Sequence, residues 1–222
     1  MSGIYARGLL HKPKYRKGDF RETGQDEARK SKNVCTDYFF VSLVTFFEAD
    51  IRMDFKTLSA QRYSVRKYNA APVEPEKLEL ILKAAQNAPT AHNNQPQRIY
   101  VLESAEALEK ADACTASHFH PPVMLVVAYD PAVSWKREYD GKDHGEIDAT
   151  IVATQMMLQA ADVGLGTTYI GMFDPVKLLA SFPEMEGTVP IAMLSLGYPA
   201  ENARPSRLHE DRKPLSELVT RL

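Results

Sequence analysis

The spacing of apolar residues separates an irregular first quarter of the chain from an orderly remainder that begins near Met53. Directly after Met53, Asp54 is placed to cap a short helix over residues 55–62. A second helix is predicted from Pro75, which suits a first helical turn, to the residue before Pro89. This helix has one apolar face, which is typical of a helix that packs against a core.

Four stretches after the second helix have the composition of β-strands. Residues 123–129 form a continuous apolar run, which is expected of a strand in the centre of a sheet. Further strands are predicted over residues 99–102, 167–171 and 191–199, and a helix is predicted over residues 103–113. Helices and strands do not alternate strictly, so the pattern favours the α+β class over a doubly wound fold.

The longest predicted helix covers residues 146–163 and stops at Gly164. Apolar side chains occur all around this helix, so we expect it to be buried on nearly every side. In a domain of this size, such burial indicates either a central helix or an interface between subunits.

Composition and charge narrow the class of protein. The chain has 222 residues, of which 44% are hydrophobic, and a formal net charge of −2. This is enough apolar material for a full core, and the chain lacks the basic excess that is usual in nucleic-acid-binding domains. Its two cysteines, Cys35 and Cys114, form neither a CxxC pair nor a disulfide framework, so we expect a reduced, cytoplasmic protein.

Residues 1–52 differ from the rest in charge and pattern. They are polar and basic at first and then contain one apolar run, residues 38–47, which is too short to span a bilayer. A basic stretch before an apolar one resembles a signal peptide, yet charged residues stand where small residues should form a cleavage site. We therefore interpret residues 1–52 as an extension, or an early start, outside a catalytic domain at residues 53–222, and we expect no membrane partner.

The stretch RYSVRKY (residues 62–68) concentrates candidate anion-binding side chains. Arg62, Ser64 and Arg66 lie at alternate positions and would share one face of an extended strand, about 13 Å from first to last. An arginine beside a serine suits a phosphate, because the guanidinium and the hydroxyl both donate hydrogen bonds. The span fits a nucleotide-sized ligand held at both ends; the alternative is a solvated strand face.

Two further stretches carry polar side chains suited to a ligand. The loop APTAHNNQPQ (residues 88–97) contains Asn93 and Gln95, whose amides each offer a donor and an acceptor to the edge of a heterocycle. The alternative for this loop is a turn-rich connector. Residues 207–215 form a second basic cluster, which matters for binding only if it folds back onto residues 62–64.

Three other kinds of motif do not support a site. Residues 164–166 (GLG) follow a helix and precede a strand, the reverse of a dinucleotide-binding fingerprint. The histidines of residues 118–120 and 144–146 lack the spacing and the third ligand of a metal centre, so no metal is expected. The sequence contains no GxSxG or other nucleophile motif.

Taken in order, four stretches resemble the motifs of the nitroreductase family of flavin-dependent oxidoreductases. They are RYSVRKY, APTAHNNQPQ, GLGTTYIGMFDP (residues 164–175) and the C-terminal stretch of residues 196–219. The resemblance extends from about Asp54 to the end of the chain. Each stretch alone is a weak signal, whereas the four in order form a specific one.

The resemblance implies roles for individual residues. Arg62 and Ser64 match the family's phosphate-binding residues, and Arg66 matches the basic residue near the pyrimidine edge of the flavin ring. The other cofactor-binding residues that it implies are Tyr63, Pro89, Thr90, Asn93, Gln95, Ile170, Gly171, Met172, His209 and Arg212. Two positions depart from the family pattern: Gln97 replaces the usual aromatic residue, and Gly171 stands where an acidic residue often lies beside flavin N5.

The resemblance also implies a central, mostly antiparallel sheet flanked by helices, in an interlocked homodimer with two FMN molecules at its interface. The implied activity is a ping-pong reaction in which NADH or NADPH donates hydride and a small nitroaromatic, aromatic or quinone-like substrate accepts it. No catalytic side chain is expected, because the cofactor carries the chemistry.

Residues 135–145 (WKREYDGKDHG) are polar and aromatic without a period, and they predict a mobile loop or lid. Two alternative activities belong to the same fold. One is reductive dehalogenation, for which Glu138, Tyr139 and Lys142 are present in the lid, and the other is oxidative breakdown of the flavin. A third alternative is a flavin carrier or sensor without turnover.

Overall fold

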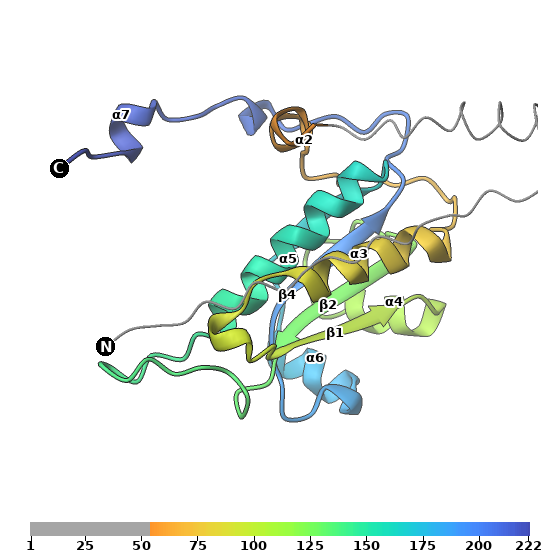
Figure 1. The fold of residues 1–222 in the computed structure, drawn as a ribbon. Helices are drawn as coiled ribbons and strands as arrows, with labels where there is room; N and C mark the ends of the chain where they lie inside the picture. The colour runs from red at the N-terminus through yellow and green to blue at the C-terminus, as the bar shows by residue number, and fades with distance from the viewer. Residues whose placement is uncertain (1–53) are drawn as a thin grey trace, which may run out of the picture. The chain divides into compact units, whose positions relative to one another are not determined.

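The computed structural model describes residues 54–222, which fold around a four-stranded antiparallel sheet (Figure 1). The strand order is β1-β2-β4-β3, with bounds of Gln97–Leu102 for β1, Val123–Tyr129 for β2, Gly166–Ile170 for β3 and Val189–Gly197 for β4. The predicted strands and the predicted α+β class are confirmed. The extension predicted for residues 1–52 lies outside the described residues.

The central position of β2 explains its unbroken apolar sequence. β2 pairs with β1 on one side and with β4 on the other, and six of its seven residues are buried. Val123, Leu125 and Val127 pack in one core, whereas Met124 and Val126 pack in another, as the alternation of side chains along a strand requires. The sheet therefore has an apolar core on each face.

Helices α5 and α3 cover one face of the sheet (Figure 1). α5 spans Gly145–Asp162 and α3 spans Pro75–Asn87. Ile81 of α3 and Val152 and Met156 of α5 are at most 1% exposed and pack against the strands. This layer positions the loops that lead into α5 and out of α3.

Helices α4 (Ala105–Asp112) and α6 (Pro175–Ser181) cover the opposite face, together with the short helix η2 (Pro183–Met185). Leu178 and Met193 are fully buried in this second core. Both faces of the sheet are therefore shielded from water, which leaves its edges and the ends of its strands to carry a site.

The predicted helix boundaries follow from local chemistry. α2 (Phe55–Gln61) begins as expected, because the carboxylate of Asp54 accepts a hydrogen bond from the backbone N–H of Thr57 over 3.1 Å. α5 ends as expected, because Gly164 has a φ of 79°, a left-handed conformation that glycine adopts without steric cost.

The chain ends in an exposed tail, residues 200–222, whose helices η3 (Arg207–His209) and α7 (Leu215–Leu218) are short (Figure 1). Large apolar side chains are exposed along this tail: Leu208, Leu215, Leu218, Val219 and Leu222. Where such side chains form one continuous patch, they can supply a surface for binding another protein.

The prediction that α5 is buried on nearly every side is wrong for the single chain. Ile147 and Ile151 are 39% and 36% exposed, although the face of α5 toward the sheet is fully buried. Tyr169 of β3, which lies beside Thr150 of α5, is 37% exposed. We call Ile147, Ile151 and Tyr169 the α5–β3 patch, and of the two interpretations of α5 it favours the subunit interface.

Candidate functional site

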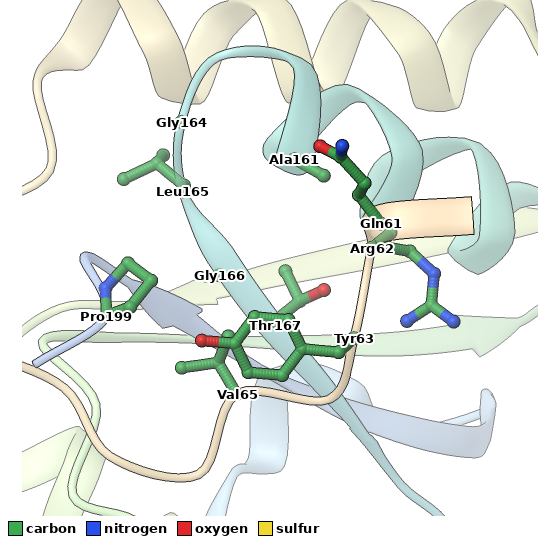
Figure 2. A pocket seen from close by; sticks show the side chains of 10 residues that line it. All are labelled: Gln61, Arg62, Tyr63, Val65, Ala161, Gly164, Leu165, Gly166, Thr167 and Pro199. Atoms are coloured by element: carbon green, nitrogen blue, oxygen red, sulfur yellow. The ribbon is translucent and has the colours of Figure 1, made fainter. Parts of the chain in front are cut away.

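The predicted phosphate-binding segment, residues 62–66, lies along the outer edge of β3 (Figure 2). Ser64 forms a parallel bridge with Thr167, and the N–H of Val65 donates to the Thr167 carbonyl over 2.9 Å. The hydroxyl of Thr168 donates to the Val65 carbonyl. The segment is therefore extended, as predicted, but it is pinned to the sheet by a single bridge and is not a regular strand.

A glycine sets how closely this segment approaches β3. Val65 is 2% exposed and packs directly on Gly166. A Cβ atom on Gly166 would lie 2.4 Å from Cγ2 and 2.7 Å from Cβ of Val65, far inside van der Waals contact. Only glycine at position 166 allows the observed approach.

The phenol of Tyr68 holds the segment by a hydrogen bond to its backbone. Its hydroxyl donates to the Val65 carbonyl over 2.6 Å and lies 2.7 Å from Oγ of Ser195. Burial raises the pKa of Tyr68 to about 12, so the phenol stays protonated and able to donate at neutral pH.

The two arginines of the segment lie on its solvent side. Arg66 is exposed, and its guanidinium donates to the Ser64 carbonyl over 3.2 Å. Arg62 is half-buried, and Figure 2 shows its guanidinium pointing away from a pocket of about 190 Å³ beside Tyr63 and Leu165. A ligand that contacts both arginines would therefore lie outside this pocket, along the outer side of the segment.

The C-terminal basic cluster, residues 207–215, folds back to the phosphate-binding segment, which is the condition for it to take part in binding. The ring of His209 lies 6.2 Å from the ring of Tyr63 in an edge-to-face arrangement. Arg212 is exposed, and its guanidinium donates to the carbonyls of Leu208 and Asp211. The roles of these residues in cofactor binding stay predictions.

The predicted ring-binding residues follow at the other end of β3. Ile170 is buried, whereas Gly171 is exposed and Met172 is 73% exposed. The carbonyl of Met172 accepts a hydrogen bond from Oγ1 of Thr115 over 2.5 Å, which fixes the backbone here. Gly171 follows Thr167 by four positions, which corresponds to about 13 Å along a strand. The edge of β3 thus has a basic segment at one end and exposed glycine backbone at the other.

The amide-rich loop, residues 88–97, has an unusual backbone conformation. His92, Asn93 and Gln95 have φ angles of 53°, 55° and 51°. Left-handed conformations are uncommon for residues other than glycine, and they cluster at ligand-binding and active sites. The side chains of Asn93 and Gln95 are exposed, and so is that of Pro89.

Side chains hold this loop in shape. The carboxylate of Asp148, on α5, accepts a hydrogen bond from the N–H of Ala91 over 3.0 Å. Within the loop, Oγ1 of Thr90 accepts from the N–H of Gln95 over 3.1 Å. Sequence reasoning did not single out Asp148, although a carboxylate in the first turns of an otherwise apolar helix was a visible signal.

Within one chain, this loop lies far from the phosphate-binding segment. The loop contacts the start of α5 through Asp148, whereas the segment lies near its end, where Ala161 borders the pocket of Figure 2. Ala161 follows Asp148 by thirteen positions, which corresponds to about 20 Å along the helix axis. In one chain the loop is therefore remote from the phosphate-binding segment, whereas the segment and the residues that follow β3 lie along the same edge of the sheet.

Residues 135–145 turn back on themselves as a short hairpin, and the prediction that they form a mobile loop or lid stays a prediction. Lys136 and Asp143 form an antiparallel bridge, and Arg137 pairs with Asp140, whose pKa falls because the guanidinium donates to its carboxylate. Tyr139 at the tip is 98% exposed.

The base of this hairpin is joined to the amide-rich loop. The ring of Trp135 stacks on the ring of His92 with 5.2 Å between centroids, and the side-chain amide of Asn94 donates to the Val133 carbonyl over 3.0 Å. These contacts join the base of the hairpin to the amide-rich loop.

The described residues, 54–222, contain neither a cluster of metal-binding side chains nor a helix that could cross a membrane. No group of three or more His, Cys, Asp or Glu side chains in this range is arranged to hold a metal ion. None of the helices in the same range is both long enough and apolar enough to cross a membrane.

Comparison with known proteins identifies the family. The sequence model that defines the nitroreductase family matches residues 60–120 and 112–198 of this chain. These residues include the phosphate-binding segment, the amide-rich loop and β3. The chain belongs to the nitroreductase family.

Individual proteins are similar to this chain over most of its length. A solved nitroreductase family protein from Clostridium difficile 630 is 37% identical, with a TM-score of 0.71 over 76% of this chain and 98% of that one. A curated NADH dehydrogenase from Thermus thermophilus is 30% identical over 201 residues, 75% of this chain and 95% of that protein. A Bacillus subtilis protein described as an NAD(P)H-dependent FMN reductase is 27% identical over 175 residues, 70% of each chain.

Proposed function

We propose that this nitroreductase family member is a homodimeric, FMN-dependent oxidoreductase that takes hydride from NAD(P)H and reduces small electron-poor acceptors such as nitroaromatics or quinones. The family and the relatives named for NADH, NAD(P)H and FMN support the class of reaction. The observation that carries the proposal is the edge of β3, where a basic, hydroxyl-bearing segment and an exposed glycine backbone lie about 13 Å apart.

The residues along this edge fit FMN at both ends. The guanidinium of Arg62 and the hydroxyl of Ser64 are suitable phosphate donors. At the other end, a Cβ atom on Gly171 would meet only the ring of Tyr169, at 3.7 Å, so the backbone there is open to a flat ring. Met172, 73% exposed, extends this open backbone by one residue.

Hydride transfer is the chemistry that FMN supplies when it is bound. The chain would bind and orient: Arg62 and Ser64 hold the phosphate, and the backbone of Gly171 and Met172 borders the ring. Arg66 would place a positive charge near the pyrimidine edge, where it favours the negative charge that reduction adds. No side chain is assigned as an acid, base or nucleophile.

We assign the amide-rich loop to the site of a second copy. One chain holds this loop about 20 Å along α5 from the phosphate-binding segment, which is too far for both to contact one phosphate end. A two-fold axis that packs the α5–β3 patch against its own copy would bury Ile147 and Ile151. The exposed apolar tail, residues 200–222, offers the same partner a second surface.

Spectroscopy and kinetics on the full chain test this proposal. The purified protein should be yellow, should bleach with NADH or NADPH in the absence of air, and should have twice the chain mass of 24.9 kDa by light scattering. With a quinone as acceptor, double-reciprocal plots should give the parallel lines of a ping-pong reaction. A colourless protein that refuses added FMN would refute the proposal, and bleaching without turnover of any acceptor would indicate a flavin carrier.

A further inference from the structure

A buried carboxylate holds the amide-rich loop, and stability alone does not explain its presence. Asp148 is 2% exposed, and its Oδ1 accepts the hydrogen bond from the N–H of Ala91. Its Oδ2 is also buried but has no hydrogen-bond partner among the described residues. A buried polar atom without a partner lowers the stability of the folded state, so a carboxylate at this position indicates a functional reason.

Asp148 lies in the first turns of α5, four positions after His144, the residue at which the helix begins. An aliphatic side chain would fit the apolar helix without leaving an unpaired oxygen. What the carboxylate adds is therefore an acceptor for the hydrogen bond from the loop.

This hydrogen bond acts at the point where the loop departs from ordinary backbone conformations. Ala91 directly precedes His92 and Asn93, which both have positive φ, and Gln95 follows with the third such angle. Conformations of this kind persist only where neighbouring groups enforce them. Fixing Ala91 to α5 therefore fixes the direction in which the exposed amides of Asn93 and Gln95 leave the loop.

We propose that Asp148 is a positioning residue, whose buried carboxylate holds the amide-rich loop in the left-handed conformation that presents the amides of Asn93 and Gln95 to FMN bound by a second copy of the chain. The inference rests on the proposed function, because it takes FMN as the ligand. Asp148 touches neither the cofactor nor the substrate and acts through the N–H of Ala91.

Three substitutions on α5 separate positioning from simple stability. Asp148→Ala removes the acceptor, and Asp148→Asn keeps an acceptor oxygen. Val152→Ala removes fully buried methyl groups one turn later and leaves the hydrogen bond between Asp148 and Ala91 in place. Titration of FMN into the flavin-stripped proteins should give a Kd about 10- to 100-fold higher for Asp148→Ala. Asp148→Asn should stay close to wild type, and Val152→Ala should lower Tm with an unchanged Kd.

Hydrogen exchange provides a readout that needs no flavin. In the stripped proteins, the Ala91 amide should exchange faster in Asp148→Ala than in wild type, and Asp148→Asn should restore its protection. Asp148→Leu fills the space of the carboxylate and carries the same expectations if the alanine variant does not fold.

The outcomes distinguish this inference from the proposed function. If Asp148→Ala lowers Tm as Val152→Ala does but keeps the affinity for FMN and the protection of Ala91, Asp148 is only structural and the inference is overturned. If the wild-type protein itself takes up no FMN, the proposed function fails and the flavin part of the inference fails with it. Exchange at Ala91 then still decides whether Asp148 anchors the loop.

Discussion

Replacing Gly166 with alanine tests whether the phosphate-binding segment depends on its close approach to β3. The added Cβ would lie 2.4 Å from Cγ2, 2.7 Å from Cβ and 3.0 Å from Cγ1 of Val65. Optimal carbon–carbon contacts lie at about 3.5–4.0 Å, so the segment must move outward by about 1 Å. Val65 cannot turn aside within the existing packing, because it is 2% exposed.

Two energetic effects follow from this displacement. Overpacking of a buried site costs about 1–3 kcal/mol, and loss of the 2.9 Å hydrogen bond from Val65 to Thr167 costs about 0.5–1.5 kcal/mol. We therefore expect Gly166→Ala to lower the free energy of unfolding by about 2–4 kcal/mol. Because Arg62 and Ser64 move with the segment, the Kd for FMN should rise about 10- to 100-fold through the loss of one charge-assisted hydrogen bond.

Urea unfolding of the flavin-free protein and FMN titration measure the two effects separately. Ile81→Val in α3, at a site 1% exposed, is the matched control: it costs about 0.5–1.5 kcal/mol but should leave the Kd unchanged. Adding Val65→Gly to Gly166→Ala removes all three close contacts, so the double variant should be more stable than the sum of the single effects predicts. Wild-type stability in Gly166→Ala, or strict additivity in the double variant, would refute the steric argument.

Three further predictions concern the cation beside the ring, the buried phenol and the first part of the chain. Arg66→Ala should keep FMN but lower its reduction potential, because a fixed cation favours the anionic reduced form; spectroelectrochemistry that finds an unchanged potential in the flavin-loaded variant would count against this role. Burial raises the pKa of Tyr68 to about 12 in the folded protein, against about 10 in the unfolded chain. The protonated phenol therefore contributes its full stability below pH 10, and as pH rises from 10 toward 12 the free energy of unfolding should fall by about 2–3 kcal/mol. The unfolding free energy of wild type should therefore fall relative to that of Tyr68→Phe across this window, and a difference independent of pH would show that the phenol is not held protonated. A protein truncated to begin at Met53 should fold, dimerise and hold FMN, whereas loss of flavin on truncation would show that residues 1–52 belong to the site.

The strands of the sheet could be predicted because buried positions in a strand are occupied by apolar residues, which are visible in the sequence. Residues 123–129 are apolar without interruption, which is the pattern expected of a strand buried on both faces, and in the structure the same residues form β2. The end of α5 was predictable for a similarly local reason, since Gly164 supplies the left-handed residue that terminates a helix.

The conformation of the amide-rich loop was not predictable from its own residues. Asparagine and histidine tolerate positive φ, but Gln95 has no such preference, and three such residues within four positions are not expected of an isolated loop. The contacts with Asp148 and Trp135 impose the conformation from outside the loop. The sequence of a segment indicates which backbone conformations its residues prefer, whereas the backbone conformation of this loop is set by contacts with residues outside it.

The hairpin at residues 135–145 escaped prediction for a different reason. A strand is recognised by alternating apolar and polar side chains, whereas this hairpin is closed by ionic pairs, Lys136 with Asp143 and Arg137 with Asp140, on exposed backbone. The burial of α5 within one chain was overestimated for another reason. Apolar side chains mark positions that are buried in the functional oligomer, and the sequence does not say whether the surface that buries them belongs to the same chain or to another copy.

The two parts of the candidate site are held in different ways, which determines how substitutions will act on each. Residues 62–66 are held by backbone pairing to β3, so changes of side chain at Arg62 or Ser64 should alter ligand binding and leave the fold intact. The amide-rich loop is held by the side chain of Asp148, so a change there alters the shape of the loop itself. Because the two parts lie at opposite ends of α5 in one chain, the proposed assembly makes packing of two copies a condition for a complete site. Any substitution that weakens the dimer should then also weaken FMN binding, even when it lies far from every residue that touches the cofactor.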